Sequence, residues 1–425
     1  MIFFKERFKK FFTFSIKEKL SIIILFLMMI LAFSLAFGYI YGKYIVLIAF
    51  ILWLFVIKKN DLKRIFNNKI IIVLIMLILF HYISILWSQD VSGAISYSNS
   101  IVRYIFVPIL IIGTIIRKEQ LKYIISAFIF GMFINEVISY LIFFDLIHTN
   151  ISMKYGYPIG FVHHVRYSVL VAFTAILILY QLRYTKNSYL QVLYAVFFIT
   201  MTANLLISGG RTGYVVYFGS LFILSFTYFK LNIKNILFLL VFPLIVFSVG
   251  FSMNKNVQSR VLMAIQAIEK IYNSNNYNTS FGARLAFYPI TIDIMKEKKN
   301  NAFFGVGAGD SKEEIKDSIK RLKNIIPSNI KHAHNSYIEM YLNVGVIGLY
   351  LYLLFFVYLI RVKIKDKEIN FVRQAFISIF MIATLADHLF RAKETMFFMG
   401  IFVAIVIVQY QHEQKSKKLS LKSNI

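Results

Sequence analysis

The chain has 425 residues, of which 59% are hydrophobic, 17% aromatic and only 16% charged, and its mean hydropathy is +0.68. Soluble domains carry about a quarter charged residues, so this composition excludes a soluble globular protein. The formal charge is +27. In a membrane protein basic residues mark cytoplasmic loops, so membrane lipids and not nucleic acid are the expected surroundings. Cysteine is absent, which excludes disulfides and Cys-ligated metal sites.

Apolar segments long enough to cross about 30 Å of hydrocarbon predict an all-α polytopic membrane protein with about twelve transmembrane helices. The first segment follows a basic stretch without a small-residue cleavage site, so we interpret it as an uncleaved span rather than a signal peptide. In chain order the predicted spans are 20–40, 41–57, 70–87, 101–116, 122–145, 165–182, 188–208, 212–229, 235–252, 334–360, 371–389 and 394–410.

Lysine and arginine gather in alternate connections, and such residues concentrate on the cytoplasmic side. Both chain termini carry basic clusters, which predicts that both face the cytoplasm. The basic connections lie near 58–69, 117–122, 183–186, 230–234 and 361–373. The loops predicted to face the periplasm are 88–100, 146–164, 209–211, 253–333 and 386–393.

The outward segment 253–333 is longer than the other connections, and a structureless loop of that length is unusual, so we expect a small folded cap. Helical spacing places Ile315, Ile319, Leu322 and Ile326 on one face, and RVLMAIQAIEKIY predicts a second amphipathic helix. Either helix could lie on the membrane surface or cover a cavity. The predicted organisation is helices one to nine in 1–252, the cap in 253–333, helices ten to twelve in 334–410 and a basic cytoplasmic tail in 411–425.

Few basic residues remain on the outward side, and these are candidates for chemistry. Arg211 lies in SGGRTG at the membrane boundary, Arg284 lies in the cap, and His332 and His334 precede the tenth span. A guanidinium matches phosphate oxygens, and a neutral histidine can take a proton from a sugar hydroxyl. Such a set could bind a lipid diphosphate and stabilise it as it leaves. The structural alternatives are arginines that reach to lipid headgroups and a histidine that is only an interfacial polar residue.

Three motifs occur in the order GARLAFYP, FFGVGAGD and HAHNSYIEMYLNVGVIGLYLYLL, preceded by SGGRTGYVV. In this order they resemble the O-antigen ligase and polymerase superfamily of bacterial membrane proteins, over about residues 205–360. The resemblance implies a metal-independent, cofactor-free, inverting glycosyltransferase of the inner membrane with a periplasmic active site. Its donor would be a glycan on undecaprenyl diphosphate. No outward loop carries a closely spaced pair of aspartates, in agreement with metal independence.

The resemblance also implies roles for individual residues. His334 would be the general base on the acceptor hydroxyl, and Arg211 and Arg284 would bind and neutralise the donor diphosphate. Asn335 and Ser336 would position the start of the tenth span. Further substrate contacts are possible from Arg166, His332, His388 and Arg391, although an ordinary polar turn is the favoured account of the last two. No role follows for His163, His164, Asp387 and Glu339.

Ligase and polymerase share this chemistry and differ in the acceptor. A ligase passes the glycan to the lipid A core, whereas a polymerase joins it to another lipid-linked glycan. Residues 253–333 hold thirteen Lys and Arg against seven Asp and Glu, a difference of +6, which favours a ligase that meets a phosphorylated core. A third alternative is a transporter of the lipid-linked glycan. It would require ionisable residues deep in the spans, such as Glu136 or Glu339, and repeated halves, and no repeat is visible.

Overall fold

The computed structural model describes residues 14–228, 255–274, 282–297, 301–322 and 333–423, and the single residues 248, 252, 277, 279 and 326. Within these residues every named element is a helix, and the one strand-like pairing is an isolated bridge between Asn301 and Gly305. The predicted all-helical class is therefore confirmed.

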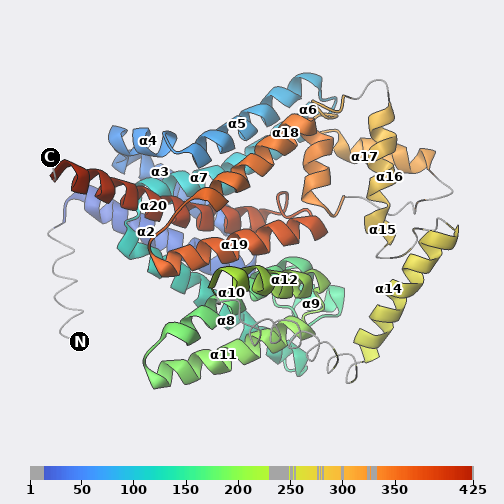
Figure 1. The fold of residues 1–425 in the computed structure, drawn as a ribbon, viewed down its shortest axis with the longest axis horizontal. Helices are drawn as coiled ribbons and strands as arrows, with labels where there is room; N and C mark the ends of the chain where they lie inside the picture. The colour runs from blue at the N-terminus through green and yellow to red at the C-terminus, as the bar shows by residue number, and fades with distance from the viewer. Residues whose placement is uncertain are drawn as a thin grey trace.

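The helices form a bundle whose long axis is horizontal in Figure 1. The first half contains α2 (Ile16–Ser34), η1 (Leu35–Phe37), α3 (Gly42–Val56), α4 (Lys59–Phe66), α5 (Lys69–Ile83), η2 (Ser84–Trp87), α6 (Val91–Ile101), η3 (Val102–Phe106), α7 (Val107–Ile115), η4 (Lys118–Gln120), α8 (Leu121–Phe143), α9 (Asn150–Tyr155), α10 (His164–Tyr184) and α11 (Ser188–Ile207). The second half contains α12 (Arg211–Tyr228), α14 (Lys255–Ser274), α15 (Gly282–Leu285), α16 (Phe287–Lys296), α17 (Ser311–Arg321), α18 (Ser336–Arg361), α19 (Lys367–Ala386) and α20 (Lys393–Ser423).

In the part of the chain that the structure describes, nine helices are long and apolar enough to cross a membrane, so the chain is a multi-pass membrane protein. Two further predicted spans are helical: 41–57 is the shorter helix α3, and 212–229 is α12. The predicted span 235–252 lies almost entirely outside the described residues. The count of twelve and the orientation of the termini stay predictions.

The predicted outward loop 88–100 is wrong, because α6 begins at Val91 and continues through η3 and α7 as one span to Ile115. The Asp90 carboxylate caps it by accepting a hydrogen bond from the Gly93 N–H at 2.8 Å. Protein surrounds much of this span, so small polar residues are tolerated where lipid would exclude them. Its buried positions follow helical spacing: Ala94, Tyr97, Ser98 and Ile101.

Helix α20 lies at the centre of the bundle and is packed against α7, α19 and η3 (Figure 1). Its phenylalanines join those of α8, α10 and α19 in an aromatic core, with ring centroids 4.7 to 6.2 Å apart. The helix extends to Ser423, through most of the tail predicted for 411–425. Lysine, glutamine and glutamate are good helix formers, and neither glycine nor proline interrupts this stretch.

Helix α18 is broken near its first third, where Val344 and Gly345 leave the helical conformation and Gly345 has a φ of +65°. The break leaves backbone N–H and carbonyl groups of α18 without partners inside the helix. Backbone groups of the FFGVGAGD loop form hydrogen bonds with them. The Val306 N–H donates to the Leu342 carbonyl at 2.8 Å, and a Cβ on Gly345 would lie 2.2 Å from the Phe303 carbonyl oxygen. The glycines of both motifs therefore allow the cap to approach α18 closely.

The predicted cap helix SKEEIKDSIKRLKNII is confirmed over Ser311–Arg321, which form α17. Ile315, Ile319 and Ile326 are buried against α16 and α18 in a small core of their own. The second predicted amphipathic helix is α14, whose Leu262, about half exposed, typifies an uncovered apolar face. In Figure 1 the cap helices lie on the right, whereas α4 and the C-terminus lie on the left. The bundle thus has a cap end and an opposite, basic end.

Candidate functional site

His334 lies in the turn that opens α18, in a strained backbone conformation. Its φ of +45° is left-handed, which costs a residue with a Cβ of the order of 1–3 kcal/mol and is found most often at functional sites. Directly after it, the Asn335 side chain accepts hydrogen bonds from the N–H groups of Tyr337 and Ile338, at 2.9 and 3.1 Å, and so caps the helix. The imidazole consequently projects from the turn and is 43% exposed.

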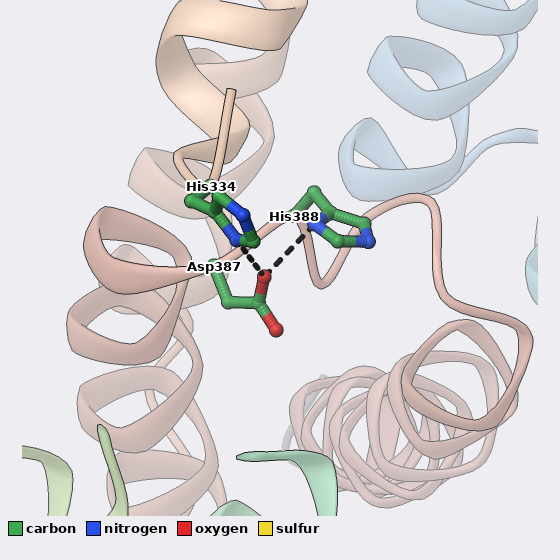
Figure 2. A group of neighbouring side chains, drawn as sticks. All are labelled: His334, Asp387 and His388. Carbon is green, nitrogen blue, oxygen red and sulfur yellow. Dashed lines mark hydrogen bonds and ion pairs between the residues drawn. The ribbon is translucent and has the colours of Figure 1, made fainter. Parts of the chain in front are cut away.

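A single buried carboxylate lies between two histidines (Figure 2). The Nδ1 atom of His334 is 3.4 Å from Oδ1 of Asp387, and the Nδ1 atom of His388 is 2.8 Å from the same oxygen. The hydroxyl of Ser336 donates to the backbone carbonyl of Asp387 at 3.0 Å. The beginning of α18 and the end of α19 are thereby joined, and the joint places the carboxylate beside His334.

The neighbouring side chains shift the pKa values of Asp387 and His388. Burial by itself would raise the pKa of Asp387, but the hydrogen bonds with His334 and His388 and the charge of His388 hold it well below its usual range. Burial lowers the pKa of His388, and the hydrogen bond and charge of Asp387 outweigh burial and raise it. Asp387 therefore stays ionised, and His388 is favoured as its cationic partner.

The raised pKa of His388 predicts a pH-dependent thermal stability. The stabilisation is fully present below the ordinary histidine pKa of 6.5 and is lost as the pH rises through the higher pKa of the folded state. We expect the melting temperature of the purified protein to fall as the pH increases above 6.5. His388→Gln should reduce this dependence, as measured by differential scanning fluorimetry. An unchanged profile would show that the pair does not form.

Arg284 lies in the electrostatic field of both Asp387 and Arg211. Burial of Arg284, on the short helix α15, lowers its pKa; the charge of Asp387 raises it again, and that of Arg211 lowers it further. Arg211 is the exposed first residue of α12. The Nε atom of Arg284 is buried and has no hydrogen-bond partner among the described residues. An unsatisfied guanidinium donor beside a second arginine is suited to a bound phosphate oxygen.

The beginning of α10 faces the same site. The charges of Asp387 and His388 act on His163, whose pKa falls to about 4 because of burial and then the charges of His164 and Arg166. His163 is therefore neutral near pH 7. Arg166 forms an ion pair with Glu394 at 3.2 Å. For Arg166 the sequence suggests a substrate contact, which stays a prediction, but nothing in GFVHHVRYS indicates that His163 lies near Asp387.

One predicted substrate contact, Arg391, already has a charged partner in the structure. Arg391 pairs with the buried Glu339 at 2.6 Å and lies 5.3 Å from the Tyr97 ring, so its charge is already compensated. Its role in substrate binding stays a prediction. Glu339, which a transporter would need as an ionisable group, has this partner instead. His332 lies outside the described residues.

Donor atoms of His334, Asp387 and His388 lie within 4.8 Å of one another, close enough to hold a metal ion. Metal ligation requires unprotonated ring nitrogens. Here both Nδ1 atoms approach a carboxylate oxygen, which suits N–H donors, and Arg284 adds a positive charge that opposes a cation. We therefore interpret the group as a hydrogen-bonded acid–base cluster.

Comparison with known families finds a match over part of the chain. Residues 196–353 match the family model described as O-antigen ligase. The match covers Arg211, Arg284 and His334, whereas Arg166 and Asp387 lie outside it. No curated protein matches the chain.

Proposed function

We propose that this chain, whose residues 196–353 place it with the O-antigen ligase and polymerase superfamily, is an O-antigen ligase. Members of the family are membrane glycosyltransferase-like enzymes that act on lipid-linked glycans. The proposed reaction transfers a glycan from undecaprenyl diphosphate to a hydroxyl of the lipid A core at the periplasmic face of the inner membrane. The observation that carries this proposal is the position of His334, held by Asp387 on the side of the molecule that bears Arg284.

In the proposed mechanism His334 is the general base. Its Nδ1–H donates to the ionised Asp387, which leaves the lone pair of Nε2 for the acceptor hydroxyl. As the hydroxyl oxygen attacks the anomeric carbon, its proton passes to Nε2, and Asp387 stabilises the imidazolium that forms. The attack comes from the face opposite the diphosphate, so the anomeric configuration inverts.

The bond that breaks joins the anomeric carbon to the diphosphate oxygen. Negative charge develops on that oxygen, and Arg211 and Arg284 are proposed to neutralise it. The buried, unpaired Nε of Arg284 supplies a donor that exchanges little with water. No metal ion is needed in this scheme, because the guanidiniums of Arg211 and Arg284 neutralise the diphosphate as a metal cation would.

Arg284→Lys is expected to lower the transfer rate by about tenfold or more, since an ammonium does not reproduce the planar fork of donors. The measurement is transfer from a purified lipid-linked donor by purified protein. Lys270→Arg, on the exposed side of α14, is the matched control and should leave the rate unchanged. A wild-type rate for Arg284→Lys would indicate that this arginine only contacts lipid headgroups.

Glycan transfer is expected to survive EDTA. The same transfer assay should give equal rates with chelator and with added Mg²⁺ or Zn²⁺. If EDTA abolishes transfer and one metal restores it, His334, Asp387 and His388 would be metal ligands, and the acid–base interpretation would be wrong.

A polymerase remains the second candidate, because the matched family does not distinguish the two acceptors. Deletion of the gene followed by lipopolysaccharide gel analysis separates them. A ligase predicts loss of capped lipopolysaccharide with accumulation of long lipid-linked polymer. A core bearing one repeat unit would instead assign the chain as a polymerase.

A further inference from the structure

The end of the bundle opposite His334 contains a cavity of about 450 Å³ that the glycan-transfer chemistry does not use. Its walls come from segments far apart in the sequence: the beginning of α2, the end of α3, α4, the α7–η4 connection and the part of α20 between Val408 and Lys415. In Figure 1 these elements lie at the left, near the C-terminus. The basic loops that predicted cytoplasmic orientation are therefore brought together around one space.

Cations outnumber anions in this cavity. The charged residues of the lining are Lys58, Arg64, Arg117, Lys118, Lys415, Asp61 and Glu119, five positive and two negative, a net +3 without His412. Both acids have partners within the lining. Asp61 is 3.0 Å from Arg64, and Glu119 is 3.9 Å from Lys118.

Three of the cations are not paired in this way. Among the described residues no carboxylate lies within 4 Å of Lys58, Arg117 or Lys415, although Arg117 is in electrostatic range of Glu18 on α2. The three come from three different segments and are exposed, so together they present a positive field to the cavity that all of them line. That field would attract an anion into the cavity.

We propose that this cavity binds a phosphate group at the cytoplasmic membrane surface, that of an anionic phospholipid. Basic pockets between transmembrane helices on this side suit anionic headgroups, and the volume is sufficient for one. Apolar residues such as Val56, Ile115 and Val408 line the same cavity and suit the glycerol backbone and first methylenes. The site would hold α4 and the end of α20 together, in addition to the Arg64–Gln411 hydrogen bond.

The test compares the melting temperature of full-length protein in nanodiscs of phosphatidylcholine with that in nanodiscs that also contain phosphatidylglycerol. We expect stabilisation by phosphatidylglycerol, weakened by salt, and retention of that lipid in native mass spectrometry. The triple variant Lys58→Gln, Arg117→Gln, Lys415→Gln should bind it about 100-fold more weakly. Lys186→Gln, on the exposed α10–α11 connection, is the control and should behave as wild type.

Additional measurements identify the molecule that supplies the bound phosphate group. Inorganic phosphate added to delipidated protein should stabilise it weakly or not at all if a lipid is the ligand, whereas full stabilisation would assign a soluble phosphate compound to the same site. Equal melting temperatures with both lipids and no response to phosphate would overturn the proposal. Lys58 and Arg117 would then only complement the helix dipoles of α3 and α7. The salt dependence of the wild type decides the question even if the triple variant does not fold.

Discussion

Replacing His334 with alanine is expected to abolish glycan transfer while the protein remains inserted and abundant. The loss of a positioned general base lowers rates by about 10²- to 10⁴-fold. Neither His388, whose ring centroid lies 5.8 Å from that of His334 (Figure 2), nor His163, which precedes α10, occupies the position of His334, so we expect neither to replace it. The measurements are transfer by purified protein and membrane abundance by immunoblot.

The chain offers a matched control for this variant. His148 also lies in a predicted outward segment and is 3.6 Å from Asp145, but both side chains are exposed. His148→Ala should therefore transfer glycan at the wild-type rate. Full activity of His334→Ala would remove the assigned base and with it the proposed mechanism.

Asp387→Asn is expected to have the second-largest effect, about 10²-fold or more on kcat with little change in KM. An amide can donate to His334 Nδ1 and so favours the tautomer with its proton on Nε2, where the base needs a lone pair. It also provides no charge to stabilise the imidazolium. The measurements are kcat, KM and the pH dependence of kcat, made on variants that have equal melting temperatures.

Asp145→Asn is the corresponding control, since Asp145 is 86% exposed and serves only His148. If Asp387→Asn lowered stability and left the kcat of the folded fraction unchanged, Asp387 would hold α18 to α19 and have no part in the reaction. That result would leave the His334 assignment intact.

Hydropathy predicted the positions of several helices well. The predicted spans 70–87, 188–208 and 371–389 coincide closely with helices of the structure. The prediction failed at 88–100, because the serines and Asn99 of α6 lower the local hydropathy of a segment that is nevertheless helical. Spacing also identified the buried face of α17, since helical periodicity is a local property.

The sequence by itself determined that the chain is a multi-pass helical membrane protein and that Arg211, Arg284 and His334 are its candidate residues. These conclusions depend on local composition and on short motifs. Only the tertiary structure decided that Asp387, more than fifty residues from His334 along the chain, lies beside it, and that Lys58, Arg117 and Lys415 surround one cavity. An apolar span has the same hydropathy whichever neighbour it packs against. The rotation and pairing of the helices, which bring distant polar side chains together, arise from packing between elements.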